Sequence, residues 1–140
     1  MRVLVCGGRA YGAIPHHTSP GGEMNEAIVR ATAERKRLSD ILDELHAKQG
    51  FSVVICGNEG SAERLATQWA SRHQIQIVAV PGGPAGRQRK GLGATPERNE
   101  RLLRSGKPDL VVAFPGGEAT QHMIGLAKAS NIPVRLIDGA

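Results

Sequence analysis

Five short apolar runs, rich in β-branched residues, recur along the chain and constrain its fold more than any other feature. They are RVLVC (Arg2–Cys6), SVVIC (Ser52–Cys56), IQIVAV (Ile75–Val80), LVVAF (Leu110–Phe114) and PVRLI (Pro133–Ile137). Most are continuously apolar, which is typical of parallel strands that are covered on both faces. The third and fifth runs carry a polar residue, which indicates strands nearer the edge of a sheet.

Helical patterns occupy the gaps between these runs. The first begins at Leu38 and ends before Gly50, the second follows Ser61 as a predicted N-cap, the third runs from Thr95-Pro96 to Gly106, and the fourth is an apolar stripe of Thr120, Met123, Ile124 and Ala127. Alternating strands and helices with short links predict the α/β class. We therefore expect residues 1–140 to form a single Rossmann-like domain, with a three-layer, doubly wound parallel sheet of about five strands.

Two segments lie outside this alternation, and both follow a predicted strand. Gly12–Glu23 is rich in Gly, Pro and Ser, and Pro81–Gly93 is similar but basic. Ligands bind at the carboxyl edge of an α/β sheet, and both segments lie there. For the first segment, a functional loop and an insertion without function remain two alternatives. For the second segment, a functional loop is favoured. The pair His16-His17 has no carboxylate or third histidine nearby, so we predict no metal site.

Composition narrows the partners. The formal net charge is +5, and the one dense basic cluster, Arg87, Arg89 and Lys90, has no aromatic platform beside it. This favours a solvated basic face over a nucleic-acid track. Cys6 and Cys56 read as buried thiols in a reducing compartment. No signal peptide or membrane span is apparent, so we expect a cytoplasmic protein without a membrane partner.

Glycine follows three of the predicted strands, at Gly7-Gly8, at Gly57 and at Gly116-Gly117. Such turns let backbone amides approach a ligand, and the helix that follows adds its positive N-terminal end. A phosphate group is the natural ligand for this arrangement. Neither the G-x-G-x-x-G fingerprint nor the G-x-x-x-x-G-K-[ST] loop is present, which argues against an ordinary NAD-dependent dehydrogenase or a P-loop NTPase.

Four stretches together resemble the YspA-like branch of the SLOG superfamily: RVLVCGGRAYG, VVICGNEGSAERLATQWA, ERNERLL and KPDLVVAFPGGEATQHMIGLAKASNIPV. That superfamily comprises Rossmann-like domains related to the "lonely guy" phosphoribohydrolases and to the DNA-processing protein DprA. The similarity covers most of the chain in the same order. It misses Gly12–Lys36, which reads as an insertion at about 12–36, and weakens over Pro81–Ala94.

The resemblance implies a pocket at the carboxyl ends of the first and fourth strands. Its residues are Gly7, Gly8 and Arg9 of the opening G-G-R, Gly57 after the second strand, the pair Arg98-Asn99, and Pro115, Gly116, Gly117 and Thr120 of the P-G-G-x-G-T loop. Arg9 and Arg98 suit phosphate oxygens, because each guanidinium is a planar fork of donors.

The chain departs from the family pattern at informative positions. Ala10 replaces an aspartate, Glu63 stands in the place of another, and Ala119 replaces the third glycine of the P-G-G-x-G-T loop, which narrows backbone approach or disfavours a positive φ. The phosphoribohydrolases carry a catalytic glutamate where this chain has Met123, whose thioether exchanges no proton. Helix geometry suggests that neither Glu118 nor Glu63 stands where Met123 points.

We therefore predict a domain that binds a nucleotide or a nucleotide-derived phosphorylated small molecule, without established catalysis and without a cofactor. One alternative is a nucleoside 5′-monophosphate phosphoribohydrolase with a rearranged acid. A second is a nucleic-acid-binding protein related to DprA. A homodimer is a further hypothesis on partners.

Overall fold

Five parallel strands form one sheet in the order β3-β2-β1-β4-β5. The computed structural model describes residues 1–14, 22–57, 60–79 and 96–137. The strands are β1 (Arg2–Cys6), β2 (Val53–Cys56), β3 (Gln76–Ala79), β4 (Leu110–Ala113) and β5 (Val134–Leu136). The predicted α/β class and the parallel sheet of five strands are confirmed. So is the placement of the third and fifth runs, which form the two edges.

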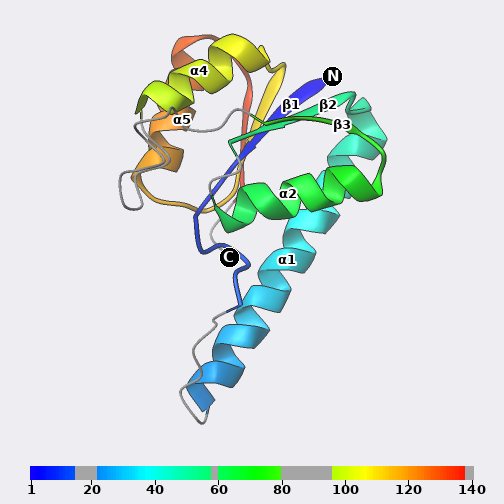
Figure 1. Ribbon diagram of the computed structural model, residues 1–140, viewed down its shortest axis with the longest axis vertical. Helices are drawn as coiled ribbons and strands as arrows, with labels where there is room; N and C mark the ends of the chain where they lie inside the picture. The colour runs from blue at the N-terminus through cyan, green and yellow to red at the C-terminus, as the bar shows by residue number, and fades with distance from the viewer. Residues whose placement is uncertain (15–21, 58–59, 80–95, 138–140) are drawn as a thin grey trace.

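Helices cover both faces of the sheet, which gives the predicted three layers. Helices α1 (Gly22–Gln49) and α2 (Ser61–Arg72) lie on one face, and α4 (Pro96–Gly106) and α5 (Glu118–Ala129) lie on the other (Figure 1). This arrangement follows from right-handed crossovers between parallel strands. The strand order is that of a Rossmann-like fold, in which the chain leaves the middle of the sheet in both directions.

The core divides into two clusters because successive residues of a strand point to opposite faces. Val3, Val5 and Val112 face α1 and α2, and they pack in one cluster with Trp69, which is fully buried. Leu4 and Val111 are among those that face α4 and α5. Both faces of the central strands are therefore apolar, which explains why their sequences show continuous apolar runs instead of alternation.

The predicted helix over 38–49 is too short. Helix α1 begins at Gly22 and has 28 residues, so it spans about 42 Å at 1.5 Å per residue, whereas β1 has five residues and spans about 17 Å. Its N-terminal half projects beyond the sheet (Figure 1). Apolar periodicity marks only the part that is packed on the core. The projecting turns are built from helix-forming residues that need no apolar stripe.

The N-cap assignment of α2 also needs correction, because the cap is Gly60 and Ser61 is the first helical residue. The Ser61 amide donates to the Arg9 carbonyl at 2.9 Å. A backbone carbonyl from the turn after β1 thus does what a serine side chain does at many helix starts. The bounds of α4 are those predicted from Pro96 and Gly106. In α5, the predicted stripe supplies the buried residues.

Candidate functional site

The middle of the sheet holds the topological switch point. From β1 the chain moves outward through β2 to β3, and from β4 it moves the opposite way to β5, while β1 and β4 pair directly with Cys6 opposite Ala113. The segments that follow β1 and β4 therefore leave on opposite faces of the sheet. Doubly wound sheets bind ligands in the crevice that this divergence opens at the carboxyl ends of the strands.

Two of the glycine turns meet at this point, backbone against backbone. The Gly8 amide donates to the Pro115 carbonyl at 2.8 Å. A Cβ atom on Gly8 would lie 2.8 Å from that same carbonyl oxygen, and a Cβ atom on Gly116 would lie 2.8 Å from the Gly8 nitrogen. Glycine is required at both positions by the close approach of the two turns, whether or not a ligand binds.

A cavity of about 140 Å³ opens beside this junction. Seven of the ten predicted site residues line it, namely Gly7, Gly8, Arg9, Arg98, Asn99, Gly117 and Thr120. They come from the turn after β1, the first turn of α4 and the start of α5. Segments distant in the sequence are thus brought together as the family resemblance implied.

Three predicted site residues lie outside this cavity. Pro115 and Gly116 line a neighbouring, larger cavity of about 680 Å³, which shares Gly8 and Arg9 with the first. Gly57 is buried behind Arg98, and a Cβ atom on Gly57 would overlap the Arg98 Nη1 atom. Gly57 therefore has an indirect role in the site. Because Gly57 has no side chain, the Arg98 guanidinium has room at the end of β2.

Arg98 forms a buried ion pair with Glu63 across the cavity wall. Its Nη1 atom lies 3.6 Å from Glu63 Oε2, and both side chains are buried. Arg98 belongs to the first turn of α4 and Glu63 to the first turn of α2. Glu63 was left out of the predicted site residues, although it replaces a family aspartate at the start of the helix after β2. Its partner was not visible, because the two residues are 35 positions apart in the sequence.

Asn99 joins α4 to α5. Its Nδ2 atom donates to the Ala119 carbonyl at 3.0 Å and lies 3.1 Å from His122 Nδ1. With 2% of its surface exposed, Asn99 holds the start of α5 in place while it also lines the cavity. Asn99 thereby also connects His122 of α5 to α4.

The helix starts at the glycine turns are not equivalent. In α2, the Ser61 amide donates to Arg9 and the Ala62 amide donates to the Gly8 carbonyl at 3.4 Å. Backbone oxygens therefore already occupy the positive end of that helix. This corrects the expectation that each glycine turn offers its amides to an anion.

The start of α5 is open by comparison. Its N-cap is Gly117, which makes no side-chain capping bond, and a Cβ atom on Gly117 would meet nothing within 4 Å. In the described part of the chain, the amides of residues 118–120 donate to no carbonyl of another segment. Thr120, which is 5% exposed, adds a hydroxyl at this position. The first turn of α5 thus faces the cavity with donors that, in contrast to those of α2, no backbone oxygen of another described segment accepts.

Cys6 forms part of the cavity wall as a neutral thiol. Burial, reinforced by the negative charge of Glu63 and opposed by Arg98, raises the pKa of Cys6 from 9.0 to about 12. The nucleophilic form of cysteine is the thiolate, so Cys6 is a poor nucleophile at neutral pH. The prediction of a buried thiol is confirmed for Cys6 and for Cys56.

The Cys6 thiol makes the free energy of unfolding depend on pH in the alkaline range. Below pH 9 both the folded and the unfolded chain keep the proton; between pH 9 and about 12 only the folded chain keeps it, so unfolding becomes more favourable as pH rises. Between pH 8 and 10.5 we expect wild type to lose about 2 kcal/mol more unfolding free energy than Cys6→Ala. Urea titrations of both proteins at the two pH values measure this difference. Equal losses would contradict the assignment.

Two further residues of the cavity bear on the missing family glutamate. Met123 and Glu118 line the cavity together with Glu63. Lining one cavity does not place either carboxylate at the position of Met123, so the expectation that neither glutamate stands where Met123 points stays a prediction. Ala119 lies within α5, so its backbone is helical and the predicted conflict with a positive φ does not arise.

Several sequence expectations fall outside the described residues, including His16-His17, the Arg87–Lys90 cluster and the Pro81–Gly93 loop. Among the residues that are described, no three His, Cys, Asp or Glu side chains are grouped to hold a metal ion. None of the described helices combines the length and apolarity needed to cross a membrane.

Comparison with known proteins gives one family and one distant relative. Residues 1–82 match the model of the YspA, cpYpsA-related SLOG family, and this match includes the turns after β1 and β2 but ends before Arg98. The Fe(3+) ions import ATP-binding protein FbpC of Pseudomonas fluorescens (strain Pf0-1) is 27% identical over 129 residues. That alignment covers 89% of this chain but 33% of the relative, so the chain spans about a third of its length. No solved structure matches the chain.

Proposed function

Because the chain belongs to the YspA, cpYpsA-related SLOG family, we propose that it binds a nucleotide or nucleotide-derived phosphorylated small molecule between the turns after β1 and β4. Family membership supports a nucleotide-related binding domain and no particular reaction. The relative FbpC is itself named an ATP-binding protein, which agrees with a nucleotide ligand but carries little weight at 27% identity.

One observation carries the proposal: the start of α5, whose amide donors are unused by other described segments, lines the same cavity as a buried arginine. The donors are those of the turn at Gly117, and the arginine is Arg98, 3% exposed. A helix start and a guanidinium that line one cavity suit a phosphate, which accepts hydrogen bonds on all its oxygens. Arg9, at the rim, is exposed and adds a second positive charge.

The sizes of the two cavities suggest how a larger ligand would be divided. At about 140 Å³, the cavity at α5 is smaller than the 300–1,000 Å³ typical of small-molecule sites, so it suits one group of the ligand. The neighbouring cavity of about 680 Å³ adjoins it at Gly8 and Arg9. It is lined partly by Tyr11, whose buried hydroxyl has no hydrogen-bond partner among the described residues. A base or sugar fits this second space, with Tyr11 as a donor or acceptor.

Binding without cleavage of the glycosidic bond agrees with the chemistry of the cavity. Met123 transfers no proton, and the Glu63 carboxylate is paired with Arg98. A rearranged phosphoribohydrolase would need Glu63 or Glu118 to act as the acid. Chromatography of the protein incubated with AMP tests this alternative, and release of free adenine that depends on Glu63 or Glu118 would establish it against our proposal.

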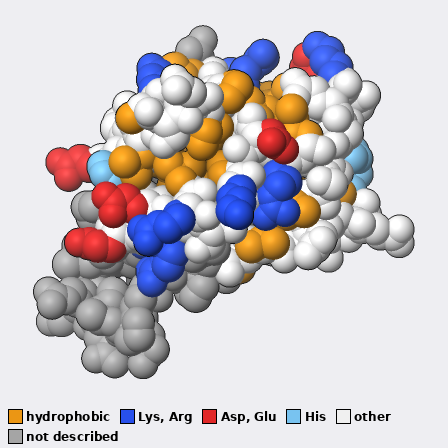
Figure 2. All heavy atoms as spheres, turned by 90° about the horizontal axis from the view of Figure 1, so that it is seen from above, with side chains coloured by type: hydrophobic (Ala, Val, Ile, Leu, Met, Phe, Trp, Pro, Cys, Tyr) orange, Lys and Arg blue, Asp and Glu red, His pale blue; other side chains and the backbone are white. Residues whose placement is uncertain are grey.

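The nucleic-acid alternative finds less support on the face of the molecule that Figure 2 shows. Figure 2 shows one face, on which Lys and Arg side chains form several groups separated by apolar and acidic side chains. A polynucleotide track would require continuous positive charge and would give binding that weakens steeply with salt. Titration with single-stranded DNA at 50 and 200 mM salt therefore separates the two ligand classes.

The glycine at the start of α5 offers a specific test of the proposal. We expect Gly117→Ala to leave stability nearly unchanged, because the added methyl group meets nothing within 4 Å, but to weaken binding of AMP, ADP or NAD at least about tenfold by occupying the ligand's approach. Gly125→Ala is the matched control: it also adds a methyl group to open space on α5, but outside the cavity. Calorimetric titration of the three proteins measures the effect. Equal affinities in all three, or no binding by wild type, would refute the proposal.

A further inference from the structure

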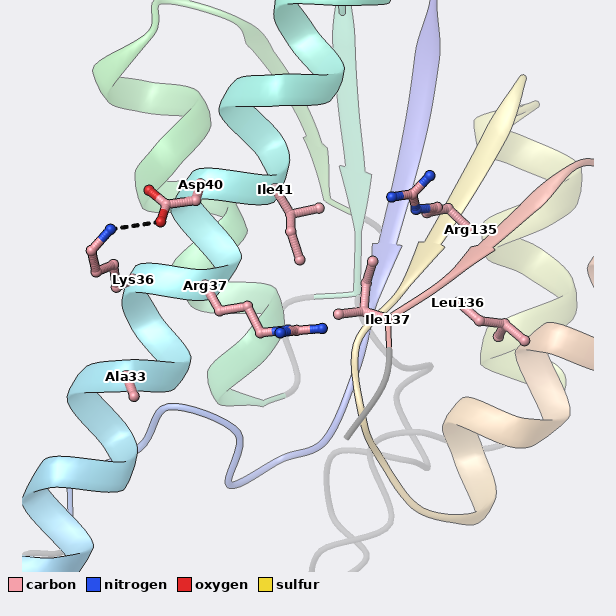
Figure 3. Close-up of a pocket in the computed structure, with 8 residues that line it drawn as sticks. All are labelled: Ala33, Lys36, Arg37, Asp40, Ile41, Arg135, Leu136 and Ile137. Carbon is pink, nitrogen blue, oxygen red and sulfur yellow. Dashed lines mark hydrogen bonds and ion pairs between the residues drawn. The ribbon is translucent and has the colours of Figure 1, made fainter. Parts of the chain in front are cut away.

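A separate groove of about 560 Å³ lies between α1 and β5 (Figure 3). It shares no lining residue with either cavity described above. One wall is a single face of α1, since Ala33, Lys36, Arg37, Asp40 and Ile41 recur at helical spacing. The other wall is the last part of the sheet, residues 135–137.

An arginine in the sheet accounts for the opening. Arg135 pairs in register with Val112 of β4, and Val112 belongs to the core cluster beneath α1 and α2. Arg135 therefore leaves the sheet on the α1 face, at a position where β1 and β4 carry valine. Its side chain is exposed. An aliphatic residue here would need a helix over it, whereas arginine keeps this corner of the sheet open to solvent.

The charges in the groove are unbalanced. Asp40 is the carboxylate among the residues that line it, and its Oδ2 atom lies 2.7 Å from Lys36 Nζ. Glu44, one turn further along α1, lies 3.0 Å from Lys48. The hydrogen bond and the charge of Lys48 are the largest causes of the lowered pKa of Glu44, and the charge of Arg135 lowers this pKa by less. Within the part of the chain that the structure describes, Asp40 and Glu44 are thus each paired with a lysine of their own helix, and Arg37 and Arg135 place two positive charges on opposite walls of the groove.

The two arginines are directed into the same space. Figure 3 shows the Arg37 guanidinium extending from α1 toward Ile137 and the Arg135 guanidinium extending from β5 toward α1. The Arg37 Nε atom is buried and has no hydrogen-bond partner among the described residues. A buried guanidinium N–H without an acceptor is unfavourable, and an oxyanion that accepts from Nε and Nη together removes this deficit.

We propose that this groove is a second ligand site, which binds a small organic anion through a carboxylate or phosphate group held between Arg37 and Arg135. The apolar part of the ligand lies against Ile41 and Ile137. A volume of about 560 Å³ is within the range of small-molecule sites, so the groove holds more than an inorganic ion. The site is independent of the proposed nucleotide site.

Nuclear magnetic resonance titration of the ¹⁵N-labelled full chain tests the site directly. The probes are inorganic phosphate, acetate and hexanoate, each compared with sodium chloride at equal ionic strength. We expect saturable shifts of the Arg37 Nε–H signal and of the amides of residues 36–41 and 135–137. Hexanoate should bind at least about fivefold more tightly than acetate, because its tail adds apolar contact. Saturation by phosphate alone assigns a phosphate ligand, and saturation by hexanoate alone assigns a carboxylate; both support the site.

Arg135→Gln is the decisive variant, because an exposed strand residue can be changed without unfolding the chain. It should weaken probe binding at least about tenfold, as should Arg37→Gln. Arg64→Gln is the matched control, because it makes the same substitution at an exposed helical position outside the groove, and it should bind as wild type does. Gly117→Ala should also leave these titrations unchanged, so the experiments distinguish a failure of this proposed site from a failure of the proposed nucleotide site. Shifts that do not saturate, equal affinity in Arg135→Gln, or a dimer that Arg135→Gln dissociates in sedimentation would each overturn the proposal.

Discussion

Arg98→Ala is expected to lower the free energy of unfolding by roughly 3–5 kcal/mol, the effect seen when one partner of a buried ion pair is removed. The reason is the Glu63 carboxylate, which would remain buried in the wall of the cavity without the guanidinium 3.6 Å away. The loss of a long side chain from beneath the first turn of α4 adds to the effect. Urea unfolding at pH 7 measures it.

A double variant separates the stability of this pair from its use in binding. Arg98→Met with Glu63→Gln removes both charges and keeps side chains of similar length, so it should recover most of the stability that Arg98→Ala loses. It should not recover nucleotide binding, because the proposed phosphate partner is gone. If Arg98→Ala loses less than about 1 kcal/mol, Glu63 reaches solvent and the pair is not the buried one described here.

Gly8→Ala and Gly116→Ala are each expected to lower the free energy of unfolding by roughly 2–4 kcal/mol, from overpacking together with loss of the backbone hydrogen bond between the two turns. A methyl group on Gly8 would lie 2.8 Å from the Pro115 carbonyl that its own amide bonds to. A methyl group on Gly116 would press on the Gly8 nitrogen and on Thr120 Oγ1. Either change forces the turns after β1 and β4 apart at the switch point.

The matched controls for this prediction lie on the same segment. Gly117→Ala should change the free energy of unfolding by no more than about 0.5 kcal/mol, and Gly125→Ala should raise it by about 0.5–1 kcal/mol because alanine favours a helix interior. Thermal and urea unfolding of the four variants in parallel gives the ranking. If Gly117→Ala is as damaging as Gly116→Ala, the distinction between packing glycines and a ligand-facing glycine is wrong.

The three glycine turns show how much of the candidate site could be predicted from the sequence. In the sequence they look alike, and each suggests backbone donors for a phosphate. In the structure, Gly8 and Gly116 serve the contact between two turns, Gly57 accommodates Arg98, and Gly117 faces open space. A glycine is needed wherever a Cβ atom would collide, and the atoms of that collision come from distant segments. The sequence therefore indicated where glycines gather but not what each one is for.

Helix α1 shows the complementary limit. Its packed part was predicted from the leucines at 38, 42 and 45, all of which are buried. Its projecting part escaped prediction, because exposed turns leave no apolar period to detect. The groove between α1 and β5 was equally hidden, since Arg37 and Arg135 are almost a hundred residues apart and each looks like an ordinary surface arginine.

The sequence by itself determined the class of the fold, the five strands and the placement of two of them at the edges. These follow from local hydrophobic pattern, which acts over a few residues. The tertiary structure alone decided that Arg98 pairs with Glu63, that the turn after β1 caps α2, and that no such contact covers the start of α5. Those facts depend on where parallel crossovers bring distant residues, and a contact across 35 or more positions leaves no trace in either local segment.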